Sequence, residues 1–112
     1  MDYNQDMEVN PKLIRDKVPE RATEEGDVLK TRVLQEDEFK GEVRRKLAEE
    51  AREAAAALTR EELLGELADV LELIITVGGT EGITVAEIEE SRLKKLARTG
   101  GFEKRLLLIG KE

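Results

Sequence analysis

The stretch from residue 47 to residue 77, LAEEAREAAAALTREELLGELADVLELIITV, decides the fold of this 112-residue chain. Its apolar residues recur at helical spacing and are interrupted by two groups of acids. Glu50 and Glu53 are three residues apart, and so are Glu66 and Asp69, which places both members of each pair on one helix face. The stretch therefore predicts two helices that each carry a pair of carboxylates.

The second of these helices is apolar around most of its circumference from residue 63 to residue 77. Its acids Glu66 and Asp69 share an arc with core residues, because Leu73 projects between them. Burying an unpaired carboxylate is costly, and a like charge beside it raises the cost. We therefore expect a compensating partner, which would be a proton, a basic side chain or a bound cation.

In the first helix, Glu50 and Glu53 lie along the edge of an apolar stripe, and the small side chains of residues 54–57 allow a close helix neighbour. Two antiparallel helices joined by a short turn would bring the four acids into one cluster. The chain has no histidine and no cysteine, whereas carboxylate oxygens suit Mg²⁺ or Mn²⁺, which commonly also hold substrate phosphates. The other interpretation is a solvated acidic face, because glutamate is a good helix former.

Length and composition predict one domain with a modest core of aliphatic residues. The second helix has more apolar surface than one small subunit can cover, which predicts a homodimer or a tetramer. A net charge of −7 disfavours nucleic-acid binding, although a local basic patch for phosphates is compatible with it. We expect no membrane association and a cytoplasmic location, since the chain has no cysteine, no signal peptide and no membrane-length apolar run.

The expected fold is mainly α, an antiparallel helical bundle with at most a small two-stranded sheet. Capping boxes formed by Thr59 with Glu62 and by Thr84 with Glu87 begin the second and third helices. Glycine pairs follow the second and third helices and are expected to end them. The predicted helices span residues 37–58, 60–77 and 85–98, with glycine pairs at 78–79 and 100–101.

Outside the helices, residues 1–10 are expected to be a flexible N-terminal arm, and residues 11–112 the single domain. Residues 11–21 have alternating basic and apolar side chains, which predict an extended segment, either solvated or forming a basic clamp near the acids. Pro19 is expected to keep Val18 out of a helix. A polar turn at residues 22–27 and strands at residues 30–34 and 102–109 complete the prediction.

Several motifs together resemble a known family. EEARE at residues 49–53, followed after twelve residues by ELAD at residues 66–69, is similar to the EExxE…ExxD signature of the MazG-like superfamily of all-α nucleoside triphosphate pyrophosphohydrolases. KLIRDKVPE at residues 12–20 and RTGGF at residues 98–102 resemble its compact branch, often labelled phosphoribosyl-ATP pyrophosphohydrolase-like. The resemblance covers about residues 11–109.

This resemblance implies Mg²⁺-dependent cleavage between the α- and β-phosphates, giving a nucleoside monophosphate and pyrophosphate, as in house-cleaning of non-standard nucleotides. Glu49 and Glu50 would be catalytic, with Glu49 supporting the site or orienting the attacking water. The implied metal ligands are Glu50, Glu53, Glu66 and Asp69, and the residues for substrate phosphates are Lys12, Arg15, Lys17, Lys94, Lys95 and Arg98.

The chain departs from the family pattern in its lack of histidine and its few aromatic rings. Only Tyr3, Phe39 and Phe102 could stack on a base, so tight base selectivity is not expected. The alternative function is a non-enzymatic acidic helical interaction module, with the acids solvated or paired with Arg92, Lys94 and Lys95. A carboxylate di-iron bundle is disfavoured, because its usual Glu-x-x-His pairs need histidine.

Overall fold

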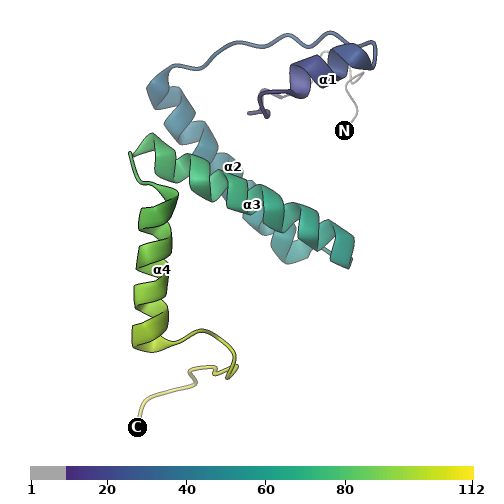
Figure 1. Cartoon of the computed structure of the whole chain (residues 1–112). Coiled ribbons are helices and arrows are strands. Elements are labelled where there is room, and N and C mark those ends of the chain that lie inside the picture. Colours follow the sequence, from purple (N-terminus) through teal and green to yellow (C-terminus); the bar gives the residue numbers. More distant parts are fainter. Residues whose placement is uncertain (1–9) are drawn as a thin grey trace. The chain divides into compact units, whose positions relative to one another are not determined.

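The structure, a computed structural model, describes residues 10–112, which are mainly helical as predicted. The predicted arm at residues 1–10 and Tyr3 lie outside the described residues, apart from Asn10. The chain divides into two compact units with the boundary between Val77 and Gly78, and each unit is described by itself. The helices are α1 (Val18–Glu24), α2 (Glu36–Ala56), α3 (Arg60–Thr80) and α4 (Val85–Thr99) (Figure 1).

The long helices α2 and α3 form the antiparallel pair of the first unit (Figure 1). Only three residues separate Ala56 from Arg60, and a connection this short makes consecutive helices neighbours. Thr59 caps α3, because its Oγ1 accepts a hydrogen bond from the Glu62 backbone N–H at 3.1 Å. Both helix boundaries therefore lie within two residues of the prediction at this turn.

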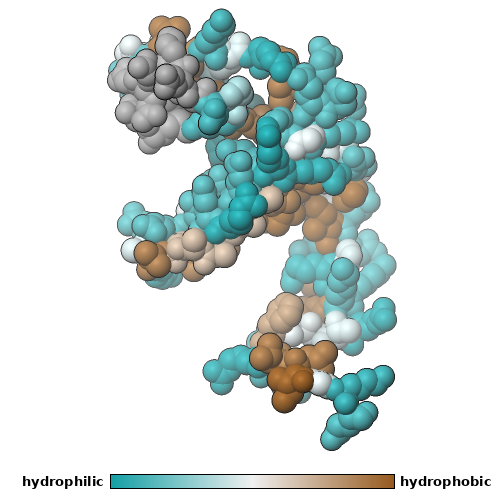
Figure 2. All heavy atoms as spheres, turned by 180° about the vertical axis from the view of Figure 1, so that it is seen from behind, coloured by the Kyte–Doolittle hydropathy of each residue, from teal (hydrophilic) through white to brown (hydrophobic). Residues whose placement is uncertain are grey.

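Buried side chains of the first unit come from three helices: Ala22 of α1, Val43 of α2 and Leu73 of α3. The burial of Leu73 agrees with the predicted core-facing arc of α3. On other sides of α3, Leu64 is 62% exposed and Leu71 is 59% exposed, and hydrophobic side chains reach the surface in Figure 2. Much of the apolar surface of α3 is thus exposed among the described residues of the first unit. No helix within residues 10–112 has both the length and the hydropathy to cross a membrane.

Helix α1 corrects the prediction of an extended segment followed by a turn. Val18 and Pro19 occupy the first two positions of the helix, where an N–H group has no intrahelical acceptor, so the missing N–H of proline costs nothing. The fixed φ of proline also suits a helix start. The expectation that Pro19 keeps Val18 out of a helix was therefore wrong. The turn predicted at residues 22–27 was correct only after the helix ends at Glu24, around Gly26, which has a φ of +92°.

The two predicted strands are also corrected, since neither residues 30–34 nor residues 102–109 form a strand in the described part of the chain. A strand needs a hydrogen-bonded neighbour, and apolar sequence alone does not supply one. Residues 102–105 instead form a turn, in which the Arg105 N–H donates to the Phe102 carbonyl at 3.0 Å. Beyond it, Leu107 and Ile109 are exposed.

The second unit is built on the turn between α3 and α4. The Gly78 carbonyl accepts from the Ile83 N–H at 2.9 Å, and Gly82 adopts a φ of +70°. A Cβ on Gly78 would lie 3.2 Å from the Ile83 carbonyl oxygen. The turn therefore leaves little room for a side chain at residue 78. Helix α3 consequently extends past the predicted glycine end to Thr80, and α4 begins at the predicted Thr84 cap.

Candidate metal centre

Three glutamates from the two long helices converge in the first unit. Glu50 and Glu53 of α2 and Glu66 of α3 each offer a carboxylate oxygen, and these oxygens lie within 4.8 Å of one another. The spacing within α2 places its two acids one turn apart, and the short turn to α3 brings Glu66 to them. Glu50 and Glu66 are half-buried, whereas Glu53 is exposed.

The carboxylates of Glu50 and Glu66 repel each other when both are ionised. A hydrogen bond between the two carboxyl groups requires a proton on one of them. This bond is the largest cause, and burial the second, that raises the pKa of Glu50 above its usual value. Lys46, whose Nζ lies 3.8 Å from Glu50 Oε1, acts in the opposite direction. Positive charge from one partly exposed lysine thus compensates the pair only in part.

Glu66 has an oxygen that is buried without a hydrogen-bond partner among the described residues, namely Oε2. An ionised carboxylate only accepts hydrogen bonds, so a second carboxyl group can satisfy this oxygen only when one of the two carries a proton. Burial without a donor costs free energy unless a proton or a cation is present. Glu66 therefore needs one of the compensating partners expected from the sequence, a proton or a cation.

Asp69, the fourth predicted ligand, lies outside this group of three. Its Oδ1 accepts a hydrogen bond from Arg15 Nη2 at 2.7 Å. Arg15 belongs to the segment before α1, so the ion pair joins that segment to α3. The structure thus brings three of the four predicted acids together and gives the fourth a basic partner.

A hollow of about 500 Å³ lies between residues 10–13 and one side of α2. Its lining includes Lys12, which was predicted to bind phosphate, and the exposed Glu49, which was predicted to be catalytic. It also includes Lys46, which connects it to the acid cluster through Glu50. Sequence reasoning missed Lys46, although its position four residues before Glu50 on one helix was a usable signal.

The remaining predicted phosphate-binding residues belong to the start of α1 and to α4. Lys17 is exposed at the start of α1, and Lys94, Lys95 and Arg98 are exposed on α4, in the second unit. Lys94 Nζ lies 3.1 Å from Glu90 Oε1, one turn earlier. Arg92 Nε similarly donates to Glu89 at 2.9 Å. These two cations, which the interaction-module hypothesis paired with the acid clusters, therefore have local partners on α4.

The donor set of the cluster fits a hard divalent cation. It consists of carboxylate oxygens, one of which is buried and unpartnered, and such oxygens suit Mg²⁺ or Mn²⁺ better than softer metals. Comparisons with models of protein families, with curated proteins and with solved structures gave no significant match to this chain. The chemistry of the residues is therefore the basis for inferring a function.

Proposed function

We propose that this protein is a Mg²⁺-dependent nucleoside triphosphate pyrophosphohydrolase of the MazG-like type, in which Mn²⁺ can replace Mg²⁺. The reaction would cleave between the α- and β-phosphates and release a nucleoside monophosphate and pyrophosphate. The observation that carries the proposal is the convergence of Glu50, Glu53 and Glu66, together with a buried oxygen of Glu66 that has no hydrogen-bond partner among the described residues. The motifs EEARE and ELAD, which place these acids, support it.

The charges around the cluster suit a metal-bound polyphosphate. Glu50, Glu53 and Glu66 would hold the cation, with Asp69 as a fourth carboxylate one turn from Glu66. A bound divalent cation supplies charge neutralisation of phosphate oxygens and lowers the pKa of a coordinated water. The chain's own contribution is to fix the acids on two rigid helices, which positions the reacting groups before substrate arrives.

Basic residues near the cluster would bind the phosphate chain. Lys12 lines the hollow beside α2 together with Lys46, and Arg15 lies on Asp69. Glu49, exposed on the same hollow, would orient the attacking water and accept its proton. Lys17, Lys94, Lys95 and Arg98 are further candidates for phosphate, with a charge that matters more than their packing.

The functional unit would be a homodimer, since α3 exposes Leu64, Leu67 and Leu71 by more than half. Apolar surface of this kind on a helix is stabilised by packing against a second helix, and twofold pairing is the simplest arrangement. Sedimentation at micromolar concentration should show a dimer. A stable folded monomer at that concentration would remove this part of the proposal.

The test of the function is a screen of nucleoside triphosphates with Mg²⁺, with release of pyrophosphate as the readout. A positive result is pyrophosphate together with the monophosphate, because release of orthophosphate would indicate cleavage at a different bond. Thermal unfolding with and without Mg²⁺ gives a second measurement, since a ligand that binds only the folded state raises the melting temperature. The sample without Mg²⁺ is kept at the same ionic strength, which controls for general salt screening.

The alternative, an acidic helical interaction module, predicts neither result. Its acids would be solvated or ion-paired, so Mg²⁺ would leave the melting temperature nearly unchanged. The exposed apolar side chains on α3 are compatible with this alternative as well as with a dimer. A protein that releases no pyrophosphate from any triphosphate and ignores both Mg²⁺ and Mn²⁺ would favour the module.

A further inference from the structure

Arg15 and Asp69 form an ion pair that stability alone explains poorly. Arg15 Nη2 lies 2.7 Å from Asp69 Oδ1, yet the two side chains are 59% and 42% exposed. Ion pairs this exposed contribute little to folding, because water and salt screen the charges. The contact nevertheless engages an acid that lies one helical turn from Glu66.

Arg15 adds two effects at this position. Its guanidinium occupies one oxygen of Asp69, so it competes with any cation for that carboxylate. Its positive charge also opposes the binding of a free cation to the neighbouring acids. Both effects lower the affinity of the cluster for a metal ion that arrives alone.

A polyphosphate reverses the effect of Arg15. The guanidinium has five N–H donors in a planar fork that matches phosphate oxygens, and phosphate binding would satisfy it as well as Asp69 does. Asp69 is then released to join Glu50, Glu53 and Glu66. Because the two binding events favour each other, metal and polyphosphate would bind cooperatively.

We propose that Arg15 is the residue that makes this site prefer a metal–polyphosphate complex over free metal ion. The proposal rests on the proposed function and adds to it a specificity-determining residue. It predicts effects of opposite sign on two ligands. An ion pair that only anchors the segment before α1 predicts no change for either ligand, and a residue that only positions Asp69 predicts weaker binding of both.

The experiment measures two affinities on the full chain. Binding of Mn²⁺ alone is followed by electron paramagnetic resonance, and binding of inorganic tripolyphosphate with saturating Mg²⁺ is followed by calorimetry. In Arg15→Ala, Mn²⁺ alone should bind roughly fivefold more tightly, because a competing charge is removed. Tripolyphosphate should bind about tenfold more weakly, because a charge-assisted hydrogen bond is lost.

Two further variants separate charge from geometry. Arg15→Lys keeps the charge but loses the fork, so Mn²⁺ affinity should stay near that of the wild type and tripolyphosphate affinity should be intermediate. Arg32→Ala is the matched control, because Arg32 forms an ion pair of the same 2.7 Å length with Glu38 at 67% and 39% exposure. It should change neither affinity.

The outcomes separate this inference from the function on which it rests. Loss of both affinities in Arg15→Ala, or no change in either, would overturn the role of Arg15 while leaving the metal site in place. A wild type that binds neither Mn²⁺ nor tripolyphosphate would overturn the proposed function itself. Opposite shifts in Arg15→Ala together with an unchanged Arg32→Ala would support the inference.

Discussion

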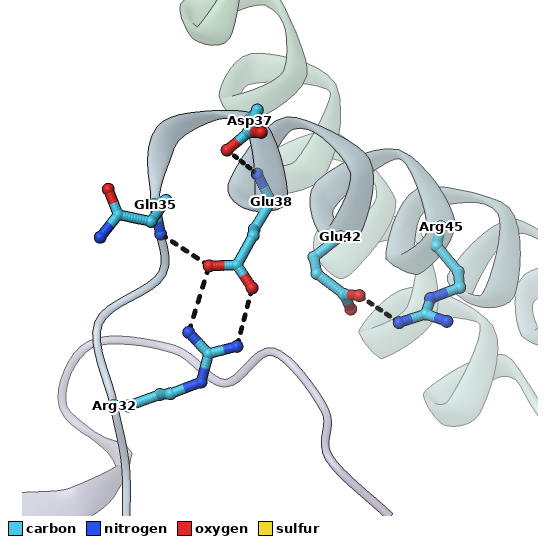
Figure 3. Close-up of polar contacts among 6 residues, drawn as sticks. All are labelled: Arg32, Gln35, Asp37, Glu38, Glu42 and Arg45. Carbon is cyan, nitrogen blue, oxygen red and sulfur yellow. Dashed lines mark hydrogen bonds and ion pairs between the residues drawn. The ribbon is translucent and has the colours of Figure 1, made fainter.

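The two ends of α2 carry glutamates in opposite electrostatic situations. Near its start, Glu38 receives two hydrogen bonds from the Arg32 guanidinium, at 3.1 and 2.7 Å, and one from the Gln35 N–H at 3.1 Å (Figure 3). Those bonds, with the Arg32 bond as the largest cause, lower the pKa of Glu38 to about 2. Twelve residues later, a second carboxylate raises the pKa of Glu50.

The donors around each carboxylate distinguish structural acids from functional ones on a single acidic helix. The carboxylate oxygens of Glu38 accept hydrogen bonds from the Arg32 guanidinium and the Gln35 N–H, so Glu38 needs no ligand to satisfy its charge. Glu50 exposes only 13% of its side chain and faces another acid, so it lacks a full set of donors. Perturbed titratable groups of the second kind mark candidate functional sites.

The largest effect is expected from Glu66→Gln, which tests whether the crowded end of α2 is a metal centre. The substitution keeps the shape and removes the charge of the unpartnered carboxylate. Hydrolysis should fall by roughly a hundredfold or more, and the Mg²⁺-induced rise in melting temperature should disappear. Without added metal, the variant should be as stable as the wild type or more stable, because like-charge repulsion is relieved. Retained Mg²⁺ stabilisation would exclude Glu66 as a ligand.

A smaller effect is expected at the other end of α2, from Glu38→Gln. The variant loses the ionised partner of Arg32 but keeps an amide oxygen that can accept from the Gln35 N–H, so the melting temperature should fall slightly. Activity and the response to Mg²⁺ should be unchanged. If Glu38→Gln and Glu66→Gln change the Mg²⁺-induced rise in melting temperature alike, general screening of acidic charge explains the metal effect. The proposed difference between the two ends of α2 would then be wrong.

The pH dependence of stability should have opposite signs for the two glutamates. The folded pKa of Glu38 lies below its ordinary value of 4.5, so its stabilisation is present above pH 4.5 and is lost as pH falls toward about 2. The folded pKa of Glu50 lies above 4.5, so its ionised form is destabilising at neutral pH, and this penalty disappears as pH falls to 4.5.

Urea unfolding of Glu38→Gln, Glu50→Gln and the wild type at several pH values measures these signs. At pH 7, Glu38→Gln should be less stable than the wild type, and Glu50→Gln as stable or more stable. The difference for Glu50→Gln should shrink by pH 4.5, whereas that for Glu38→Gln should shrink only at lower pH. Parallel pH profiles for the two variants would contradict the assignment of opposite environments.

The smallest effect is expected from Lys46→Met, which removes the partial compensation of Glu50. The Nζ of Lys46 lies 3.8 Å from Glu50 Oε1, and its charge lowers the pKa of Glu50. The variant should therefore raise that pKa, by a small amount because the pair is partly screened. Titration of the labelled Glu50 carboxyl carbon by NMR measures it. A fall in the pKa would show that Lys46 does not compensate Glu50 in solution.

Local signals in the sequence predicted the long helices well, because their causes lie within a few residues. The hydroxyl of Thr84 accepts from the Glu87 N–H at 3.1 Å, as the capping box predicted. Apolar spacing also predicted that Leu73 is buried. The cap at Gln35, whose backbone N–H donates to Glu38 at 3.1 Å, was missed because glutamine is not among the residues preferred at a helix N-cap.

The failures had two causes, a dependence on partners and a rule for proline applied at the wrong place. The predicted strands at residues 30–34 and 102–109 had suitable apolar residues but no partner strand in the described chain. Helix α1 was missed because the rule for a residue before proline was applied to Val18, and the tolerance of proline at a helix start was not.

For the candidate site, the sequence by itself determined which acids share a helix face, because a helix repeats every 3.6 residues. It therefore predicted that Glu50 and Glu53 lie on one face and that Glu66 and Asp69 share an arc with core residues. Only the tertiary structure decided that these three converge while Asp69 pairs with Arg15, 54 residues away. The physical reason is that helical periodicity fixes direction about one axis, whereas distances between helices and to a preceding segment depend on how they pack.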